Sequence, residues 1–230
     1  SVTSQMKKTL KKYPAGGVIM FAKNIDTPDQ TKKMTDDLQD ASYIPLFMAV
    51  DEEGGQVTRL AGKAGFDLPV YDNMSVIGSQ GDTEQAYQMG ESIGQYLDDL
   101  GFNTDFAPVA DVLTNPNNQV VRYRSFGSDP ETVKDMTDAV SRGLASKKIL
   151  ATYKHFPGHG ASNGDSHFLW PYIHNYKSVL NKHIIPFEKA INSGCDAIMV
   201  GHLIIRKLTG IYPASLSKSF VKNYLRDMCN

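Results

Sequence analysis

Five short runs of β-branched and other apolar residues, separated by longer segments with helical periodicity, constrain the fold of this chain more than any other feature. Each run has the length and composition of a buried strand. They are GVIMF at 17–21, PLFMAV at 45–50, FNTDFAPV at 102–109, KILATY at 148–153 and CDAIMV at 195–200. Strands that alternate with helices pair in parallel through right-handed crossovers, so we expect an α/β protein with a parallel sheet.

The intervening segments carry recognisable helix signals. Thr27 supplies an N-cap, Pro28 the first helical position and Gln30 a capping-box residue, and residues 128–130 open another helix with Ser-Asp-Pro. Between residues 82 and 100, apolar residues fall three or four positions apart and predict one buried stripe: Ala86, Met89, Ile93, Leu97 and Leu100. This stripe is expected to pack on the sheet.

Polar residues directly after the runs favour a (β/α)8 barrel of the TIM type over an open doubly wound sheet. Asp51 follows the second run, Lys154 and His155 follow the fourth, and His202 follows the fifth. The carboxyl ends of barrel strands meet at one face, whereas an open sheet would leave some of these groups away from its single crevice. The barrel is therefore the prediction.

Five runs are fewer than the roughly eight strands that close such a barrel. The chain starts with a helix that no strand precedes, and its last helix, from a cap at Ser217, reaches Asn230 with no strand after it. We therefore expect residues 1–230 to be a single barrel domain that is incomplete at both ends. Two unpaired sheet edges would then favour self-association or pairing with a complementary fragment.

Composition excludes several classes of protein. With 41% apolar and 21% charged residues, the 230-residue chain can bury a substantial core. The formal net charge of −1 gives no net attraction to nucleic acid. No apolar run approaches the roughly 18 residues that cross a bilayer, and two cysteines do not make a disulfide framework. A soluble protein with a neutral ligand is the expectation, and its compartment stays open.

The densest group of ionisable residues is KHFPGHGASNGDSH at 154–167. Three interpretations stand beside one another. The first is a solvated loop whose histidines cap backbone carbonyls. The second is a metal site, because imidazole and carboxylate groups are competent zinc or iron ligands: His155, His159, Asp165 and His167. The spacing matches no familiar zinc pattern, and Pro157 with Gly158 rules out a helix between the first two histidines.

The third interpretation is acid/base catalysis. Asp165 and His167 are two positions apart on a glycine-rich loop. At that spacing the carboxylate can accept a proton from the ring, fix its tautomer and stabilise the imidazolium. Such a histidine can donate a proton and then remove one.

The block KHFPGHG followed by DSH resembles the signature of the β-N-acetylglucosaminidase branch of glycoside hydrolase family 3. Further blocks agree in order and spacing: GGVIMF, AVDEEGGQVTRL, GFNTDFAPVADV, RSFGSDPETV and PFEKAINSGCDAIMVGH. The resemblance covers almost the whole chain. It implies a (β/α) barrel that releases terminal β-linked N-acetylglucosamine from peptidoglycan fragments or chitooligosaccharides. It also implies that no cofactor or metal is used, and that Asp165 and His167 form the acid/base pair.

Residue by residue, the resemblance also implies a sugar-binding set. Its members are Asp51, Arg59, Arg124, Lys154 and His155, with His202 lining the same pocket. Such a set suits a sugar, because a carboxylate accepts two hydroxyls at once while arginine and lysine donate to the remaining oxygens. Asp105 and Asp111 are interpreted as supports for loops and are left out of the site.

The sequence departs from the family in one respect. A retaining mechanism in this family uses an aspartate nucleophile in a G-x-x-x-S-D-D-like block after the seventh strand, and residues 1–230 hold no such block. Retention needs a carboxylate about 5 to 5.5 Å from the acid/base group, so the nucleophile stays unknown and the 230 residues alone are expected to be inactive or nearly so. Three alternatives stay open: a catalytically dead sugar-binding module, a metal-dependent barrel hydrolase and a β-glucosidase of the same family.

Overall fold

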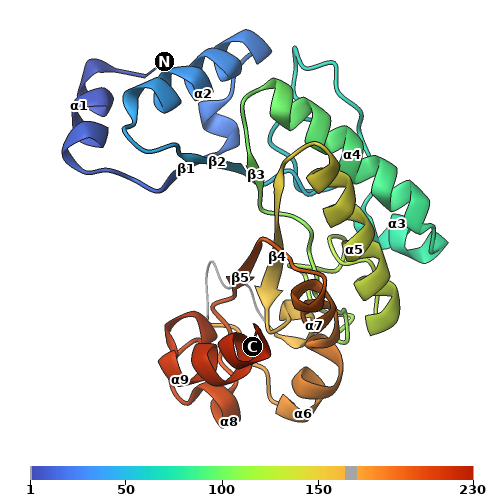
Figure 1. Cartoon of the computed structure of the whole chain (residues 1–230). Helices are drawn as coiled ribbons and strands as arrows, with labels where there is room; N and C mark the ends of the chain where they lie inside the picture. Colours follow the sequence, from blue (N-terminus) through green and yellow to red (C-terminus); the bar gives the residue numbers. More distant parts are fainter. Residues whose placement is uncertain (1, 164–169, 230) are drawn as a thin grey trace.

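The computed structural model describes residues 2–163 and 170–229, which are built around a five-stranded parallel sheet (Figure 1). The strands are β1 (Gly17–Met20), β2 (Phe47–Val50), β3 (Thr104–Asp105), β4 (Leu150–Phe156) and β5 (Ala197–Val200). They pair in the order in which they occur in the chain, with Gly17 opposite Phe47 and Thr152 opposite Ala197. Sequential order is that of a barrel wall, whereas an open doubly wound sheet reverses its order at a switch point. The predicted α/β class is confirmed, and each of the five predicted runs contains a strand, although the third, 102–109, is regular only at Thr104–Asp105.

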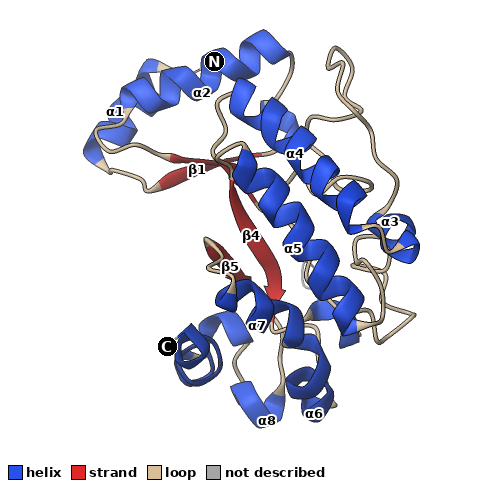
Figure 2. Ribbon diagram, turned by 45° about the vertical axis from the view of Figure 1, so that its right-hand side comes forward, coloured by secondary structure: helices blue, strands red, loops and turns tan. Residues whose placement is uncertain are grey.

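Helices connect the strands and cover the sheet. They are α1 (Ser4–Lys12), α2 (Pro28–Ala41), α3 (Met74–Gln80), α4 (Thr83–Asp99), α5 (Pro130–Ser146), α6 (Tyr176–Ser178), α7 (Ile185–Asn192), α8 (Arg206–Thr209) and α9 (Lys218–Phe220). Wider helical turns at 179–183 and 221–226 prolong α6 and α9. The long helices α4 and α5 lie side by side on one side of the sheet in both views (Figure 2). In residues 2–163 and 170–229, no helix has both the length and the apolar character that a membrane crossing requires.

The predicted helix starts are confirmed. Thr27 Oγ1 accepts a hydrogen bond from the Gln30 N–H at 3.2 Å, and Asp129 Oδ2 accepts one from the Thr132 N–H at 2.9 Å. The Gln30 side chain accepts from the Asp26 N–H at 2.9 Å, one residue before the position of a standard capping box. These caps fix where α2 and α5 begin.

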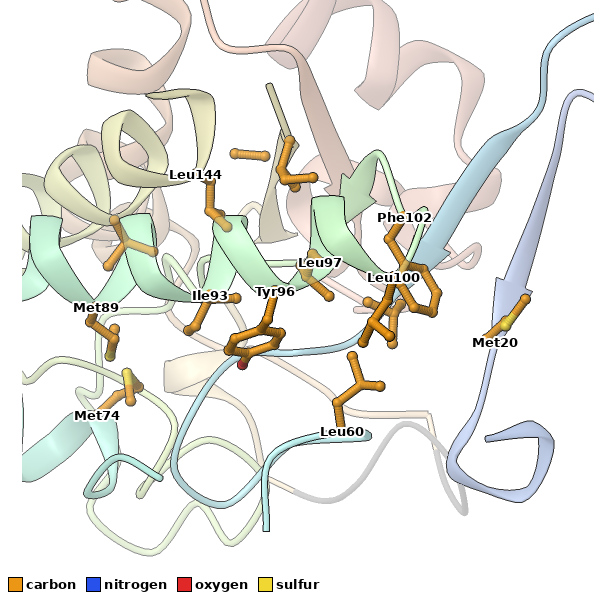
Figure 3. Close-up of a cluster of buried hydrophobic side chains, with 14 of the residues drawn as sticks. Met20, Leu60, Met74, Met89, Ile93, Tyr96, Leu97, Leu100, Phe102 and Leu144 are labelled. Atoms are coloured by element: carbon orange, nitrogen blue, oxygen red, sulfur yellow. The ribbon is translucent and has the colours of Figure 1, made fainter. Parts of the chain in front are cut away.

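The predicted stripe on α4 is buried. Its five apolar residues, Ala86, Met89, Ile93, Leu97 and Leu100, are each at most 8% exposed. Figure 3 shows the side chains of α4 directed toward Met74 and Leu60, which come from the segment between β2 and α4. Burying a large apolar side chain stabilises the fold by about 1.5–3 kcal/mol. The stripe therefore holds that segment, which carries part of the site, against the helix layer.

The two long helices approach so closely that their backbones meet at glycines. A Cβ atom at Gly90 would lie 2.3 Å from the Val140 carbonyl oxygen, and one at Gly143 would lie 2.3 Å from the Tyr87 carbonyl oxygen. Any larger residue would force the helices apart. No role was predicted for these two glycines from the sequence.

The inward face of the sheet forms a hollow of about 630 Å³ lined mainly by apolar side chains. Ile19 and Phe47 are about half exposed there. Within the described residues, no strand pairs with the outer edge of β1 or of β5. The expected self-association through such edges stays a prediction.

Candidate active site

All six residues of the predicted sugar-binding set line one cavity of about 570 Å³. The topology accounts for this, because Asp51 directly follows β2 and His202 follows β5. Lys154 and His155, expected to follow the fourth strand, lie within β4 near its carboxyl end. Arg59 and Arg124 reach the cavity from the long segments after β2 and β3. The hollow on the sheet face is mainly apolar. The polar side chains therefore point to the cavity at the strand ends as the site.

The charged groups of the cavity form a chain of alternating sign. Lys154 Nζ lies 2.9 Å from Asp51 Oδ1 and 2.6 Å from Glu53 Oε1. Arg124 donates from Nε and Nη2 to the two oxygens of Glu53, at 2.8 and 2.6 Å. Arg59 Nη2 lies 3.5 Å from Asp51 Oδ2. Three cations and two carboxylates thus hold one another around the cavity.

Glu53 is ionised in this arrangement. Burial alone would raise the pKa of its carboxyl, but the charges and hydrogen bonds of Lys154 and Arg124 outweigh burial and lower the pKa to about 2. Glu53 was not predicted as a site residue, although it lies inside the block AVDEEGGQVTRL. The predicted set itself pointed to a further acid, because it placed two arginines and one lysine in a pocket with Asp51 as the only carboxylate.

Asp111 orients a site histidine. Its Oδ2 lies 2.7 Å from His155 Nδ1, and its Oδ1 accepts from the backbone N–H groups of His155 and His159 at 3.1 and 2.6 Å. Burial acts to raise the pKa of Asp111, but His155 and its hydrogen bonds hold the pKa well below its usual range. With a carboxylate facing Nδ1, that nitrogen carries the proton and Nε2 is the one available to a ligand. The predicted role of Asp111 as a loop support is therefore too narrow, because it also contacts a site side chain.

Glu52 and Asp105 shape the backbone next to the site. The Glu52 carboxylate accepts from the backbone N–H groups of Arg59, Leu60 and Ala61 and from the Tyr96 hydroxyl. Asp105 Oδ1 accepts from the Glu52 N–H at 3.0 Å. Burial raises the pKa of both carboxyls. Asp105 thus has the supporting role predicted for it, and Glu52 fixes the turn that presents Arg59.

The predicted acid/base pair, Asp165 and His167, lies outside the described residues. His159, which precedes the pair in the sequence, lines the cavity, and its ring centre is 5.9 Å from that of His155. Asn163 pairs with Tyr172, which brings the described ends of this segment together. The assignment of Asp165 and His167 stays a prediction.

The described part of the chain offers no group of side chains that could hold a metal ion. Residues 2–163 and 170–229 contain no cluster of three or more His, Cys, Asp or Glu side chains suited to a metal ion. Of the four ligands considered, only His155 and His159 are described, and His155 Nδ1 already faces Asp111.

The model of the glycosyl hydrolase family 3 N terminal domain matches residues 1–230. The chain is 35% identical over 214 residues to "Beta-hexosaminidase LpqI" of Mycobacterium tuberculosis (strain ATCC 25618 / H37Rv), covering 93% of this chain and 54% of that protein. It is 34% identical over 209 residues to "Beta-hexosaminidase A" of Pseudoalteromonas piscicida, covering 86% of this chain and 34% of that protein. The chain thus spans from about a third to just over half the length of these relatives.

Solved structures agree in fold. A glycoside hydrolase family 3 β-N-acetylglucosaminidase from Paenibacillus sp. str. FPU-7 matches with a TM-score of 0.93 and 33% identity, over 99% of this chain and 44% of that one. NagZ from Neisseria gonorrhoeae, solved in complex with N-trifluoroacetyl-D-glucosamine, matches with a TM-score of 0.91 and 30% identity, over 98% of this chain and 68% of that one. The barrel architecture expected from the strand ends is that of these proteins.

Proposed function

The chain belongs to glycosyl hydrolase family 3, and on that premise we propose that the intact protein is a β-N-acetylhexosaminidase in which residues 1–230 supply the sugar-binding and acid/base groups. The observation that carries this proposal is the set of complementary charges at neighbouring strand ends around one cavity. The resemblance of KHFPGHG and DSH to the N-acetylglucosaminidase branch supports the choice of sugar. Relatives named β-hexosaminidase support it further.

The cavity suits the hydroxyl groups of a terminal pyranose. Asp51 Oδ1 and Oδ2 face Lys154 and Arg59 and keep lone pairs for hydroxyl donors. Arg124 and Lys154 bring N–H groups for hydroxyl oxygens. His155, held through Nδ1 by Asp111, brings Nε2. Charge-assisted hydrogen bonds are stronger than neutral ones, so this set would hold one ring firmly and in one orientation.

In the proposed reaction His167 acts as the acid and then as the base. It would protonate the departing glycosidic oxygen while a carboxylate attacks the anomeric carbon, and it would next take a proton from the water that releases the sugar. Asp165 would hold its tautomer and stabilise the imidazolium. None of the residues matched to the family blocks has the role of the attacking carboxylate, and we leave the nucleophile unassigned.

The proposed substrates are peptidoglycan fragments or chitooligosaccharides with a terminal β-linked N-acetylglucosamine. The Paenibacillus neighbour is described as a β-N-acetylglucosaminidase, and the Neisseria neighbour was solved with an N-acylglucosamine analogue. A role in peptidoglycan turnover is proposed on the same basis.

Hydrolysis of aryl glycosides by the intact protein tests the proposal. We expect turnover of an aryl N-acetyl-β-glucosaminide and much slower turnover of the matching β-glucoside. Asp165→Asn and His167→Gln should each reduce kcat by about 10²-fold or more, because general acid/base catalysis contributes about 10²- to 10⁴-fold. Comparable losses support a dyad. Sugar binding without any turnover would instead favour a catalytically inactive binding module, and preference for the glucoside would exclude the proposed substrate.

A further inference from the structure

We propose that Glu53 is a positioning residue that holds Arg124 and Lys154 in the geometry needed to bind the terminal sugar. The inference rests on the proposed function, because it concerns how that site holds its substrate. Glu53 is not in the predicted sugar-binding set.

Glu53 lines the cavity but is almost completely enclosed by its protein partners. Its side chain is 1% exposed, Oε2 accepts from Arg124 Nε, and Oε1 is shared by Arg124 Nη2 and Lys154 Nζ. With 1% of its side chain exposed, the carboxylate offers the sugar almost no surface. Its effect on binding must therefore pass through the two cations.

Both cations depend on Glu53 for their positions. The Lys154 side chain is 2% exposed, and a buried ammonium is tolerated only when carboxylates are paired with it. Arg124 presents two N–H groups in parallel to Glu53, which fixes the plane of the guanidinium. Apart from Glu53, the Arg124 side chain donates to the Val120 carbonyl oxygen at 3.2 Å.

Loss of the Glu53 charge would also alter Asp51. Lys154 lies between the two carboxylates, 2.6 Å from Glu53 and 2.9 Å from Asp51. Without Glu53, the attraction of the ammonium would fall on Asp51 alone. The Asp51 oxygen that faces Lys154 would then be held more tightly by the ammonium and would be less available to a sugar hydroxyl. The expected defect is therefore in substrate binding.

The chain provides a matched control in Asp138. This carboxylate also pairs with an arginine and a lysine, with Arg142 Nε at 3.1 Å and Lys189 Nζ at 3.7 Å, but it lies on helix α5 and does not line the cavity. Glu53→Gln and Asp138→Asn each remove one negative charge with little change of shape. The Asp138 side chain is 18% exposed, so this control matches the charge that is lost but not the burial of Glu53. A rise in KM that is confined to Glu53→Gln shows that loss of an ion pair elsewhere on the chain does not weaken substrate binding.

The test measures KM and kcat of the intact protein on an aryl N-acetyl-β-glucosaminide. For Glu53→Gln we expect KM to rise about thirtyfold or more, because breaking a buried hydrogen-bonded charge pair weakens binding on that scale. The loss in kcat should be several times smaller, as for an interaction made equally in the ground and transition states. Glu53→Asp should recover part of the binding, and Asp138→Asn should keep the KM of the parent protein.

A KM for Glu53→Gln within about threefold of the parent value, or a rise matched by Asp138→Asn, would overturn the inference. If Glu53→Gln does not fold, Glu53→Asp decides by the same comparison.

If the parent protein hydrolyses no N-acetylglucosaminide, the proposed function fails, and the Arg124 Nε–H signal in ¹⁵N NMR spectra tests the positioning separately. That signal should shift in Glu53→Gln and stay in place in Asp138→Asn; an unchanged signal in Glu53→Gln would refute the positioning role.

Discussion

Asp51, Glu52 and Glu53 are consecutive acids, yet their partners give them three different roles. Asp51 faces the cavity beside Lys154 and Arg59, Glu52 turns inward to backbone N–H groups, and Glu53 pairs with two cations. The family resemblance implied only the first of these roles from the sequence. The turn after β2 decides which of the three adjacent carboxylates meets which partner. That turn is held by contacts of Glu52 with Tyr96, which is 44 positions away, and with the backbone of residues 59–61, and neither contact has a recognisable sequence pattern.

Asp111→Asn is expected to weaken substrate binding through His155. An amide can replace at most one of the acceptor oxygens that now meet His155 Nδ1 and two backbone N–H groups. The ring would lose its fixed tautomer, so KM on the aryl N-acetyl-β-glucosaminide should rise about tenfold or more. Steady-state kinetics of the intact protein would measure this, and a KM equal to that of the parent would show that Asp111 supports only the backbone.

The pH dependence of stability gives a second measurement on Asp111. Because the pKa of Asp111 is lowered in the folded state, its contribution to the free energy of unfolding is present above its ordinary pKa of about 4 and is lost as the pH falls toward the folded value. Asp111→Asn should therefore lose less stability than the parent between pH 5 and pH 3. Equal slopes in urea unfolding over this range would contradict the assignment.

At the scale of elements, periodicity and cap signals predicted the strands and the helix starts, because burial and capping act on neighbouring residues. The third run behaved differently: 102–109 was predicted as one strand, and only Thr104–Asp105 is regular. Pro108 has no N–H for a ladder, but the segment stays beside β4 through Lys154 N–H to Pro108 O at 3.2 Å and Ala110 N–H to Lys154 O at 2.6 Å. Such irregular pairing has no periodic signal in a sequence.

Gly90→Ala tests the close crossing of α4 and α5. The added Cβ would lie 2.3 Å from the Val140 carbonyl oxygen, so the helices must separate. Overpacking typically costs about 1–3 kcal/mol, against a gain of up to about 1 kcal/mol from helix propensity. We expect a net loss in the free energy of unfolding, measured with urea. Gly16→Ala is the control, because a Cβ there meets nothing within 4 Å. Equal stabilities of the two variants would show that the crossing tolerates a methyl group.

At the scale of the whole molecule, the sheet has two edges that no described strand covers and an inward face on which Ile19 and Phe47 are half exposed. Unpaired edges and contiguous apolar surface favour association. A polypeptide of residues 1–230 alone is therefore expected to sediment as dimers or larger species. Phe47→Lys should weaken that association about ten- to a hundredfold, the equivalent of one buried phenylalanine. Tyr43→Lys, at a position that is 98% exposed and does not line the hollow, should leave it unchanged. A monodisperse monomer in sedimentation velocity would show instead that the sheet tolerates its open face in water.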